Sequence, residues 1–256
     1  MLDGGKFYQK NYIWVIFYHN MNKKYKKIAL IMAMEGEAKP IIEHYKLKRI
    51  AFHNPIIVYA NEDQSLIVSL NGKSKEHGID NIGTQAATLN AFITISNYQP
   101  ELIINCGTAG GFKAKGGKIG DTYIATEKIC FHDRRIDLPG GFAAYALGNY
   151  PVIDSDFLAK KFNLKQGIIS SSDALDYTKT DMAIFQKNNA SVKEMEAAAI
   201  AWVCQMNTQE FTAIKTITDI VDGAHCTSEE FLENFEMASY ALKKNIVKII
   251  NFLTPG

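Results

Sequence analysis

Two kinds of hydrophobic pattern alternate along the chain. Short runs that are apolar at nearly every position indicate strands buried on both faces of a sheet, whereas apolar residues that return every three or four positions indicate helices. The predicted strands are 28–34, 55–60, 65–70 (joined to 55–60 as a hairpin), 102–106, 120–126, 167–173 and 211–218, and the predicted helices include 78–97 and a long one through 249. This alternation predicts a single three-layer α/β domain, with a central twisted mixed sheet flanked by helices.

A dry helix with acidic residues near both ends lies in the segment 191–222. Residues 197–204 are apolar at every position, so a helix here is predicted to pass through a core. Glu194 and Glu196 precede this helix, and Asp219 ends the strand that follows it. Carboxylates beside apolar surface are costly unless they are paired or serve in chemistry, so these residues are candidates for a functional site.

The carboxylates before the helix also have a structural explanation. Ser191 with Glu194 three residues later fits a capping box, in which each side chain satisfies a backbone N–H group of the other residue. Glu196 fits a solvated helix surface. The segment alone does not decide between structure and chemistry.

Glu37 and a glycine cluster stand where ligands bind in α/β folds. Glu37 lies in a turn into a helix after the strand 28–34, and the glycine-rich residues 107–111 follow the strand 102–106. Ligands of open α/β sheets bind beyond the carboxyl ends of strands, and glycine lets them approach the backbone. The cluster is not G-x-G-x-x-G and no Walker lysine follows, so a nucleotide-phosphate cradle fits poorly. For Glu37 the alternative is a solvated glutamate favoured by the helix dipole.

The composition is that of an ordinary globular protein and excludes several classes of partner. The chain has 256 residues, 47% apolar and 21% charged, with a formal net charge of +1, so no global field attracts nucleic acid or anionic lipid. Four cysteines without a CxxC pair indicate reduced thiols in a cytoplasmic protein. Six scattered histidines lack the spacing of metal ligands, so a metal site is not expected, and no organic cofactor is called for.

The first 26 residues differ from the rest. The apolar run 13–18 is shorter than the ~7 to 15 residue core of a signal peptide and lacks a small-residue cleavage site. It is also far shorter than the ~20 residues that span a membrane. We therefore expect residues 1–26 to form a poorly ordered N-terminal extension or to dock by this apolar run, and residues 27–254 to form the domain.

A His-Asp pair begins an irregular stretch that reaches about Pro151. His132 and Asp133 invite comparison with a catalytic triad, but no serine or cysteine lies in a nucleophile elbow. The pair is therefore interpreted as part of a loop ion pair.

Five short motifs follow one another along the chain. They are AMEGE at 33–37, INCGTAGG at 104–111, FHD at 131–133, KEMEA at 193–197 and TDIVD at 218–222. Together they resemble the 5′-methylthioadenosine/S-adenosylhomocysteine nucleosidases, and the resemblance extends from about residue 27 to 253. GID at 78–80 and HDRRI at 132–136 are closer to the plant-type members than to the bacterial ones. The resemblance implies a fold of the nucleoside phosphorylase kind.

The resemblance implies an enzyme that uses water to split adenine from the ribose of a thionucleoside in methionine salvage. Breaking this bond builds oxocarbenium character on the sugar, so the leaving base needs an acid and the water needs a base. By the resemblance, Asp219 is the acid that protonates adenine and Glu37 activates the water. Glu196 binds the ribose hydroxyls, and Met195 lies against the sugar and sulfur.

The resemblance also implies a base-recognition stretch at 172–176. Leu175 faces adenine, where many bacterial members have an aromatic residue, and the backbone around Asp176 reads the edge of the base. Further substrate-binding residues implied by the resemblance are Met34, Thr108, Glu194 and Lys215, the last at a position where bacterial members often have arginine. Glu194 remains divided between catalytic support and capping. Residues 71–78 depart from the bacterial loop, so the resemblance does not identify the side chains that position water.

Two alternatives to a nucleosidase are considered. A purine nucleoside phosphorylase attacks the same bond with phosphate and needs cations at the nucleophile, whereas Glu37 would repel phosphate. A non-catalytic storage or binding relative would have lost the chemistry, but Glu37, Glu196 and Asp219 are all present. Both comparisons favour the hydrolase.

The resemblance further implies a homodimer, in which a neighbouring chain helps to close the pocket for the thio substituent. The apolar stretch 142–150 is a candidate for that interface or for a substrate lid. The expected partner is a small thionucleoside, with neither nucleic acid nor membrane. We expect 5′-methylthioadenosine to be a better substrate than S-adenosylhomocysteine, whose amino-acid tail needs a longer open channel.

Overall fold

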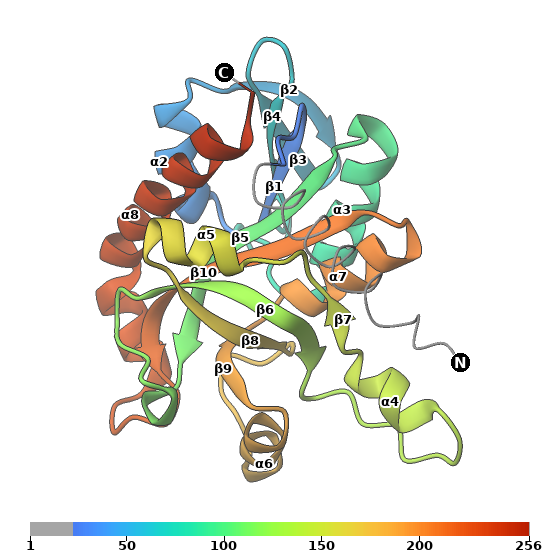
Figure 1. Ribbon diagram of the computed structural model, residues 1–256, viewed down its shortest axis with the longest axis vertical. Helices are drawn as coiled ribbons and strands as arrows, with labels where there is room; N and C mark the ends of the chain where they lie inside the picture. Colours follow the sequence, from blue (N-terminus) through green and yellow to red (C-terminus); the bar gives the residue numbers. More distant parts are fainter. Residues whose placement is uncertain (1–22, 256) are drawn as a thin grey trace, which may run out of the picture.

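The computed structural model describes residues 23–255 as strands and helices that alternate along the chain, as predicted (Figure 1). The strands are β1 (Ile28–Met32), β2 (Lys48–His53), β3 (Ile56–Ala60), β4 (Leu66–Leu70), β5 (Leu102–Gly111), β6 (Thr122–Phe131), β7 (Tyr150–Pro151), β8 (Lys165–Ser171), β9 (Ala190–Glu194) and β10 (Glu210–Ile220). The helices are α2 (Glu35–His44), α3 (Thr84–Tyr98), α4 (Phe142–Leu147), α5 (Asp156–Phe162), α6 (Lys179–Lys187), α7 (Ala197–Met206) and α8 (Thr227–Leu253), with a 3₁₀ turn η1 (Lys113–Lys115).

One mixed sheet contains these strands, and half of it closes on itself. The strand order is β10-β6-β8-β9-β5-β1-β4-β3-β2, with β7 paired to β6. Because β10 also pairs with β5, the strands β5, β10, β6, β8 and β9 form a ring, from which β1, β4, β3 and β2 extend. The predicted class, an α/β domain with a mixed central sheet flanked by helices, is confirmed. The ring is a pairing between distant segments that periodicity does not predict.

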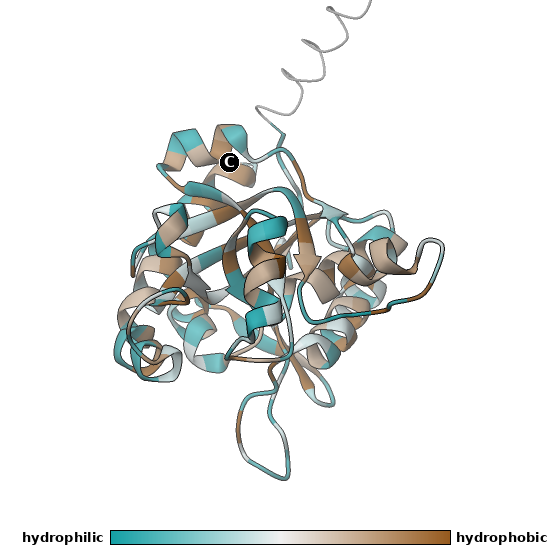
Figure 2. Ribbon diagram, turned by 90° about the horizontal axis from the view of Figure 1, so that it is seen from below, coloured by the Kyte–Doolittle hydropathy of each residue, from teal (hydrophilic) through white to brown (hydrophobic). Residues whose placement is uncertain are grey.

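Helices cover both faces of the sheet. Strand β1 is therefore buried on both faces, which explains why its sequence is apolar throughout. Helices α2, α5 and α8 lie on one face and α3 and α7 on the other (Figure 1). Ala29 and Ile31 belong to the core with α3 and α7, whereas Leu30 and Met32 belong to the core with α2 and α8. Each fully buried side chain of this size contributes on the order of 1.5–3 kcal/mol. Hydrophilic residues lie mainly on the outer helices and loops (Figure 2).

Two helices follow the predicted patterns closely. Helix α7 is buried along most of its length, including Ala197 to Ala201, and packs on α3 and the sheet. Helix α8 buries residues at intervals of three or four positions, among them Ala238, Leu242 and Ile246. The hairpin β3–β4 is also present, as an antiparallel pair.

Several boundaries differ from the prediction. Helix α3 begins at Thr84 rather than 78, because Gly78 and Gly83 have φ angles of 69° and 95°, which a right-handed helix cannot contain. Strand β2 was missed because its side chains are mostly exposed and lack an apolar run. The stretch expected to be irregular up to Pro151 contains the short helix α4 and strand β7.

The part of the predicted extension that the structure describes, residues 23–26, contacts the domain. Tyr25 is buried, its backbone N–H donates to Leu253 O at 2.8 Å, and its hydroxyl donates to Glu210 Oε2 at 2.8 Å. The predictions for residues 1–22 lie outside the described residues. Between residues 23 and 255, no helix combines the length and apolar composition that crossing a membrane requires.

Candidate functional site

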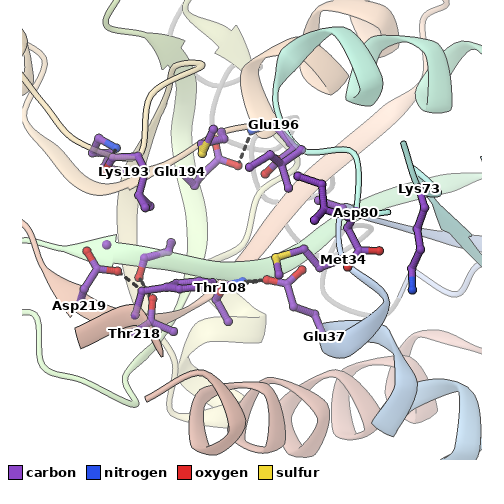
Figure 3. Close-up of a pocket in the computed structure, with 18 of the residues that line it drawn as sticks. Met34, Glu37, Lys73, Asp80, Thr108, Lys193, Glu194, Glu196, Thr218 and Asp219 are labelled. Atoms are coloured by element: carbon purple, nitrogen blue, oxygen red, sulfur yellow. Dashed lines mark hydrogen bonds between the residues drawn. The ribbon is translucent and has the colours of Figure 1, made fainter. Parts of the chain in front are cut away.

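A cavity of about 400 Å³ opens at the carboxyl ends of β1, β5 and β10. Figure 3 shows its long axis, with Asp219 and Lys193 at one end and Lys73 and Asp80 at the other. The lining residues come from segments far apart in the sequence: Ala33, Met34, Glu37, Lys73, Gly78, Ile79, Asp80, Ile82, Thr108, Ala109, Gly110, Leu175, Lys193, Glu194, Met195, Glu196, Thr218, Asp219 and Phe231.

Glu37 lies in the first turn of α2 and is held against the glycine-rich residues 107–111, which continue β5 to Gly111 rather than following a strand that ends at 106. Its carboxylate is 3% exposed and accepts hydrogen bonds from the backbone N–H and the hydroxyl of Thr108, both at 2.7 Å. A Cβ atom on Gly107 would lie 3.2 Å from both carboxylate oxygens, so glycine permits this approach. Burial raises the pKa of Glu37, although Thr108 and the charge of Lys215 oppose the shift. The alternative of a solvated glutamate is therefore wrong.

Asp219 enters the cavity through a β-bulge in β10. The pairing with β5 shifts between Ile217 and Asp219, which leaves Thr218 as the extra residue. Asp219 Oδ1 accepts from Thr218 Oγ1 at 2.8 Å, and the buried Oδ2 has no hydrogen-bond partner within residues 23–255. A Cβ atom on Gly110 would lie 2.7 Å from Oδ2. Burial raises the pKa of Asp219, against the opposing effects of Thr218 and Lys193, so this carboxyl group is suited to carry a proton.

Lys215 is a buried cation shared by two glutamates. Its side chain is 1% exposed, and Nζ lies 2.8 Å from Glu194 Oε2 and 3.9 Å from Glu196 Oε2. Burial opposes the charge on Lys215, but Glu194 and Glu196 outweigh it and raise its pKa. Glu196 Oε1 also accepts from Gly83 N at 2.9 Å. Burial raises the pKa of Glu196 to about 7, so its charge state changes near neutral pH.

Glu194, the last residue of β9, binds backbone N–H groups at the start of helix α7, but not in the way the capping box predicts. Its carboxylate accepts from the backbone N–H groups of Glu196 at 3.0 Å and Ala197 at 2.9 Å. Ser191 belongs to β9, and the N-cap residue is Glu196, so the predicted capping box with Ser191 is wrong. Glu196 is buried, which also contradicts the solvated helix surface. Burial tends to raise the pKa of Glu194, but Lys215 and the hydrogen bonds lower it below the usual range. Glu194 thus serves both the helix terminus and the ion pair.

Buried amides hold the base of the loop 72–83, which forms one wall of the cavity. Asn71 Nδ2 donates to Asn81 O at 3.0 Å, and Asn81 Nδ2 donates to Asn71 O at 3.2 Å. Asn90 Nδ2, on α3, donates to Asn71 Oδ1 at 2.9 Å. Two side chains of this loop, Ile79 and Ile82, are largely exposed and line the cavity. This wall was not predicted from the sequence, because residues 78–83 were expected to be helical.

Comparison with known proteins agrees with this architecture. The family model described as "Phosphorylase superfamily" matches residues 27–251. The chain belongs to the phosphorylase superfamily. A curated "5'-methylthioadenosine nucleosidase" of Arabidopsis thaliana is 36% identical over 233 residues, 88% of this chain and 86% of the relative. A "5'-methylthioadenosine/S-adenosylhomocysteine nucleosidase" of the same organism is 38% identical over 234 residues, 89% of this chain and 91% of the relative.

The solved structures place the chain in the same part of the phosphorylase superfamily. The apo form of Arabidopsis thaliana 5′-methylthioadenosine nucleosidase superposes with a TM-score of 0.87 at 34% sequence identity. The match covers 91% of this chain and 98% of that one. The resemblance recognised from the five motifs, to the plant-type nucleosidases, is therefore confirmed.

Most residues expected at the site of this superfamily member line the cavity. Those that do are Met34, Glu37, Thr108, Leu175, Glu194, Met195, Glu196 and Asp219. Lys215 lies behind the wall, bound to Glu194, and the exposed side chain of Asp176 is not part of the lining. Leu175 is 44% exposed, and its side chain forms part of the cavity rim.

Several residues that reach the cavity by long-range contacts were not predicted from the sequence to belong to the site. Lys73 and Asp80 face each other across an isolated β-bridge at one end, and Phe231 comes from α8. Lys193 belongs to the motif KEMEA, but no role was assigned to it. Only the GID motif at 78–80 pointed to this part of the loop.

The His-Asp pair is not an ion pair. His132 is buried, with Nδ1 3.0 Å from Ser170 Oγ, and burial lowers its pKa to about 4. Asp133 accepts from the backbone N–H of Asp173 at 3.1 Å. The ion pair of this loop joins Arg135 to Asp181 at 3.0 Å instead. The four cysteines are free, and all but Cys226 are buried.

Proposed function

We propose that this protein is a nucleosidase that hydrolyses the N-glycosidic bond of 5′-methylthioadenosine and releases adenine and methylthioribose. The observation that carries the proposal is the arrangement of three buried carboxyl groups in one cavity. Asp219, with a raised pKa and an Oδ2 that has no hydrogen-bond partner within residues 23–255, lies at one end, and Glu37 is fixed to Thr108 on β5 (Figure 3). Glu196, held by Gly83, lines the same space.

Each group suits one step of the reaction. Burial raises the pKa of Asp219 and so favours its protonated form, which can protonate the leaving adenine as the bond breaks. Glu37 takes a proton from water, which attacks the anomeric carbon as positive charge develops on the ribose. Glu196 accepts hydrogen bonds from the ribose hydroxyls and holds the sugar between acid and base.

The charges around Glu37 favour water over phosphate as the nucleophile. Among the described lining residues the cations are Lys73 and Lys193. Lys73 is paired with Glu35 at 2.8 Å, and Lys193 is bound to backbone carbonyl oxygens. The third nearby cation, Lys215, is buried and paired with Glu194. A phosphate dianion would therefore meet the Glu37 carboxylate without a cation to neutralise it.

The deciding measurement is adenine release by the purified protein from 5′-methylthioadenosine, with and without phosphate. We expect equal rates in both buffers and free methylthioribose as the second product. Strict dependence on phosphate would make the protein a phosphorylase and remove the water-activating role from Glu37. No release from 5′-methylthioadenosine or S-adenosylhomocysteine would favour the storage or binding alternative.

The end of the cavity away from Asp219 supports a preference for an uncharged 5′ substituent. The apolar side chains of Met34, Ile82 and Phe231 line the cavity and suit a methylthio group. Asp80 lies at the end of the cavity opposite Asp219 (Figure 3), near the paired Lys73 and Glu35, so the local charge is net negative. The amino-acid tail is zwitterionic, and this charge is unfavourable for it when the carboxylate, rather than the ammonium group, lies beside Asp80.

We expect kcat/KM for 5′-methylthioadenosine to exceed that for S-adenosylhomocysteine. The variant Asp80→Asn should raise kcat/KM for S-adenosylhomocysteine about threefold and leave the value for 5′-methylthioadenosine unchanged, since partly exposed charges contribute about 1 kcal/mol or less. Steady-state kinetics on both substrates measure this, with Asp63→Asn, in an exposed turn, as the matched control. An equal or higher kcat/KM of the unmodified protein for S-adenosylhomocysteine would contradict the preference.

We also propose that residues 27–254 act in methionine salvage in the cytoplasm, as a homodimer. The free cysteines suit a reducing compartment. Phe142 and Tyr145 expose large apolar surfaces on α4, within the stretch considered for the interface or lid. Sedimentation of the purified chain would give the oligomeric state directly.

A further inference from the structure

A buried lysine on β9 links that strand to the turn at Ala174 and Leu175, at the end of the cavity where Asp219 lies. Lys193 is 5% exposed, and its Nζ donates to Ala174 O at 2.7 Å and to Leu175 O at 2.8 Å. It lines the cavity beside Asp219 (Figure 3). Burying an ammonium group is costly, so a lysine here needs an explanation beyond filling space.

We propose that Lys193 is a positioning residue for adenine release, which fixes the turn beside the base and places a positive charge next to the acid Asp219. The inference rests on the proposed nucleosidase function and adds a residue to it. Lys193 would act through its neighbours, because its ammonium group is engaged by carbonyl oxygens.

The hydrogen bonds of Lys193 fix the conformation of the turn beside it. The turn 173–177 is largely exposed, and Leu175, which faces the cavity, is 44% exposed. Near its start, the backbone N–H of Ala174 donates to Ser172 Oγ at 3.2 Å. Lys193 then holds two consecutive carbonyl groups at once, which fixes the backbone just before Asp176. A turn without regular secondary structure depends on such side-chain bonds to keep one conformation.

Lys193 also has an electrostatic effect on Asp219. The charged groups that act on Lys193 are Asp219 first, then Glu194, Asp176 and Asp181, and all of them oppose the effect of burial, which lowers its pKa. On the other side, Asp219 is affected by Thr218, by Lys193 and by the like charge of Glu230 on α8. Lys193 and Asp219 line the same end of the cavity (Figure 3), and the charge of Lys193 lowers the pKa of Asp219 against the effect of burial.

This charge matters at the moment of proton transfer. When Asp219 gives its proton to adenine it becomes a carboxylate in a buried site, and a fixed cation nearby lowers the energy of that product. Without the cation, Asp219 is a weaker acid and its pKa rises. Activity requires protonated Asp219, so losing Lys193 moves the alkaline limb of the kcat profile to higher pH while kcat itself falls.

The test compares Lys193→Met and Lys193→Arg with the unmodified protein and with Lys187→Met, an exposed lysine at the end of α6. With 5′-methylthioadenosine, we expect Lys193→Met to lower kcat at least tenfold and to move the alkaline limb up by about one pH unit. Lys193→Arg keeps the charge and should keep the limb in place. Lys187→Met should change neither. If Lys193→Met does not fold, Lys193→Gln supplies a neutral donor and should show the same displacement.

Two results would overturn the inference. One is an unchanged kcat and pH profile in Lys193→Met. The other is a loss of activity with the alkaline limb unmoved, which a merely structural role would produce. A failure of the proposed function is distinguishable, because the unmodified protein would then release no adenine.

Discussion

The substitution Asp219→Asn is expected to lower kcat for adenine release by about 10²–10⁴-fold, the usual contribution of a general acid. Asparagine has nearly the same shape but no transferable acidic proton, so the leaving adenine would have to depart without protonation. KM should change much less, because the acid acts on the bond that breaks.

The fold should survive this change. Asp219 is a buried carboxyl group whose raised pKa favours the neutral form and whose Oδ2 has no hydrogen-bond partner among the described residues, so a neutral amide in its place breaks no hydrogen bond of Oδ2. We expect a melting temperature equal to or above that of the unmodified protein. Asp222→Asn is the matched control, since Asp222 binds the backbone N–H groups of Lys113 and Ala114 outside the cavity. A rate within about tenfold of normal in Asp219→Asn would refute its role as the acid.

The substitution Lys215→Met should have the largest effect on stability. It leaves Glu194 and Glu196 buried without their cation, and removing one partner of a buried ion pair typically costs about 3–5 kcal/mol. We expect a loss of this size in the free energy of unfolding at pH 8, measured by urea denaturation. Lys48→Met, at an exposed position of β2, serves as the control and should cost less than about 0.5 kcal/mol.

The cost of Lys215→Met should depend on pH in a defined direction. In the unmodified protein the pKa of Glu194 is lowered, so its contribution to stability is present above the unfolded pKa of ~4.3 and is lost as pH falls. The raised pKa of Lys215 keeps its contribution present below ~10.4. In the variant, both glutamates bind protons more readily in the folded state, so the destabilisation should shrink between pH 8 and pH 5. An equal cost at both values would show that packing, rather than charge, is responsible.

The sequence predicted the strands and helices whose periodicity is set by burial. β1 is apolar at every position because it meets a core on both faces, and α7 is apolar because it packs against both α3 and the sheet. Glu37 and Asp219 were each predicted near the carboxyl end of a strand, and the structure shows both of them lining one cavity.

The sequence could not predict contacts that depend on the meeting of distant segments. Whether Glu194 caps with Ser191 or pairs with Lys215 depends on β9 and β10 both pairing with β5, which local periodicity does not record. The role of Lys193 cannot be predicted from the sequence, because it depends on the carbonyl oxygen of Ala174, which binds its ammonium group only in the folded structure. Residues 78–83 of the loop were predicted as helix because Ile79 and Ile82 match a helical spacing, whereas the positive φ angles of Gly78 and Gly83 exclude one.

Strand β5 has a consequence for how the protein is made. It is paired with β1 near the start of the chain and with β10 near its end, and it also meets β9. Long-range pairing of this kind makes folding slow and leaves intermediates exposed. A nascent polypeptide whose strand β10 is still inside the ribosome therefore lacks Lys215 and Asp219 at its cavity.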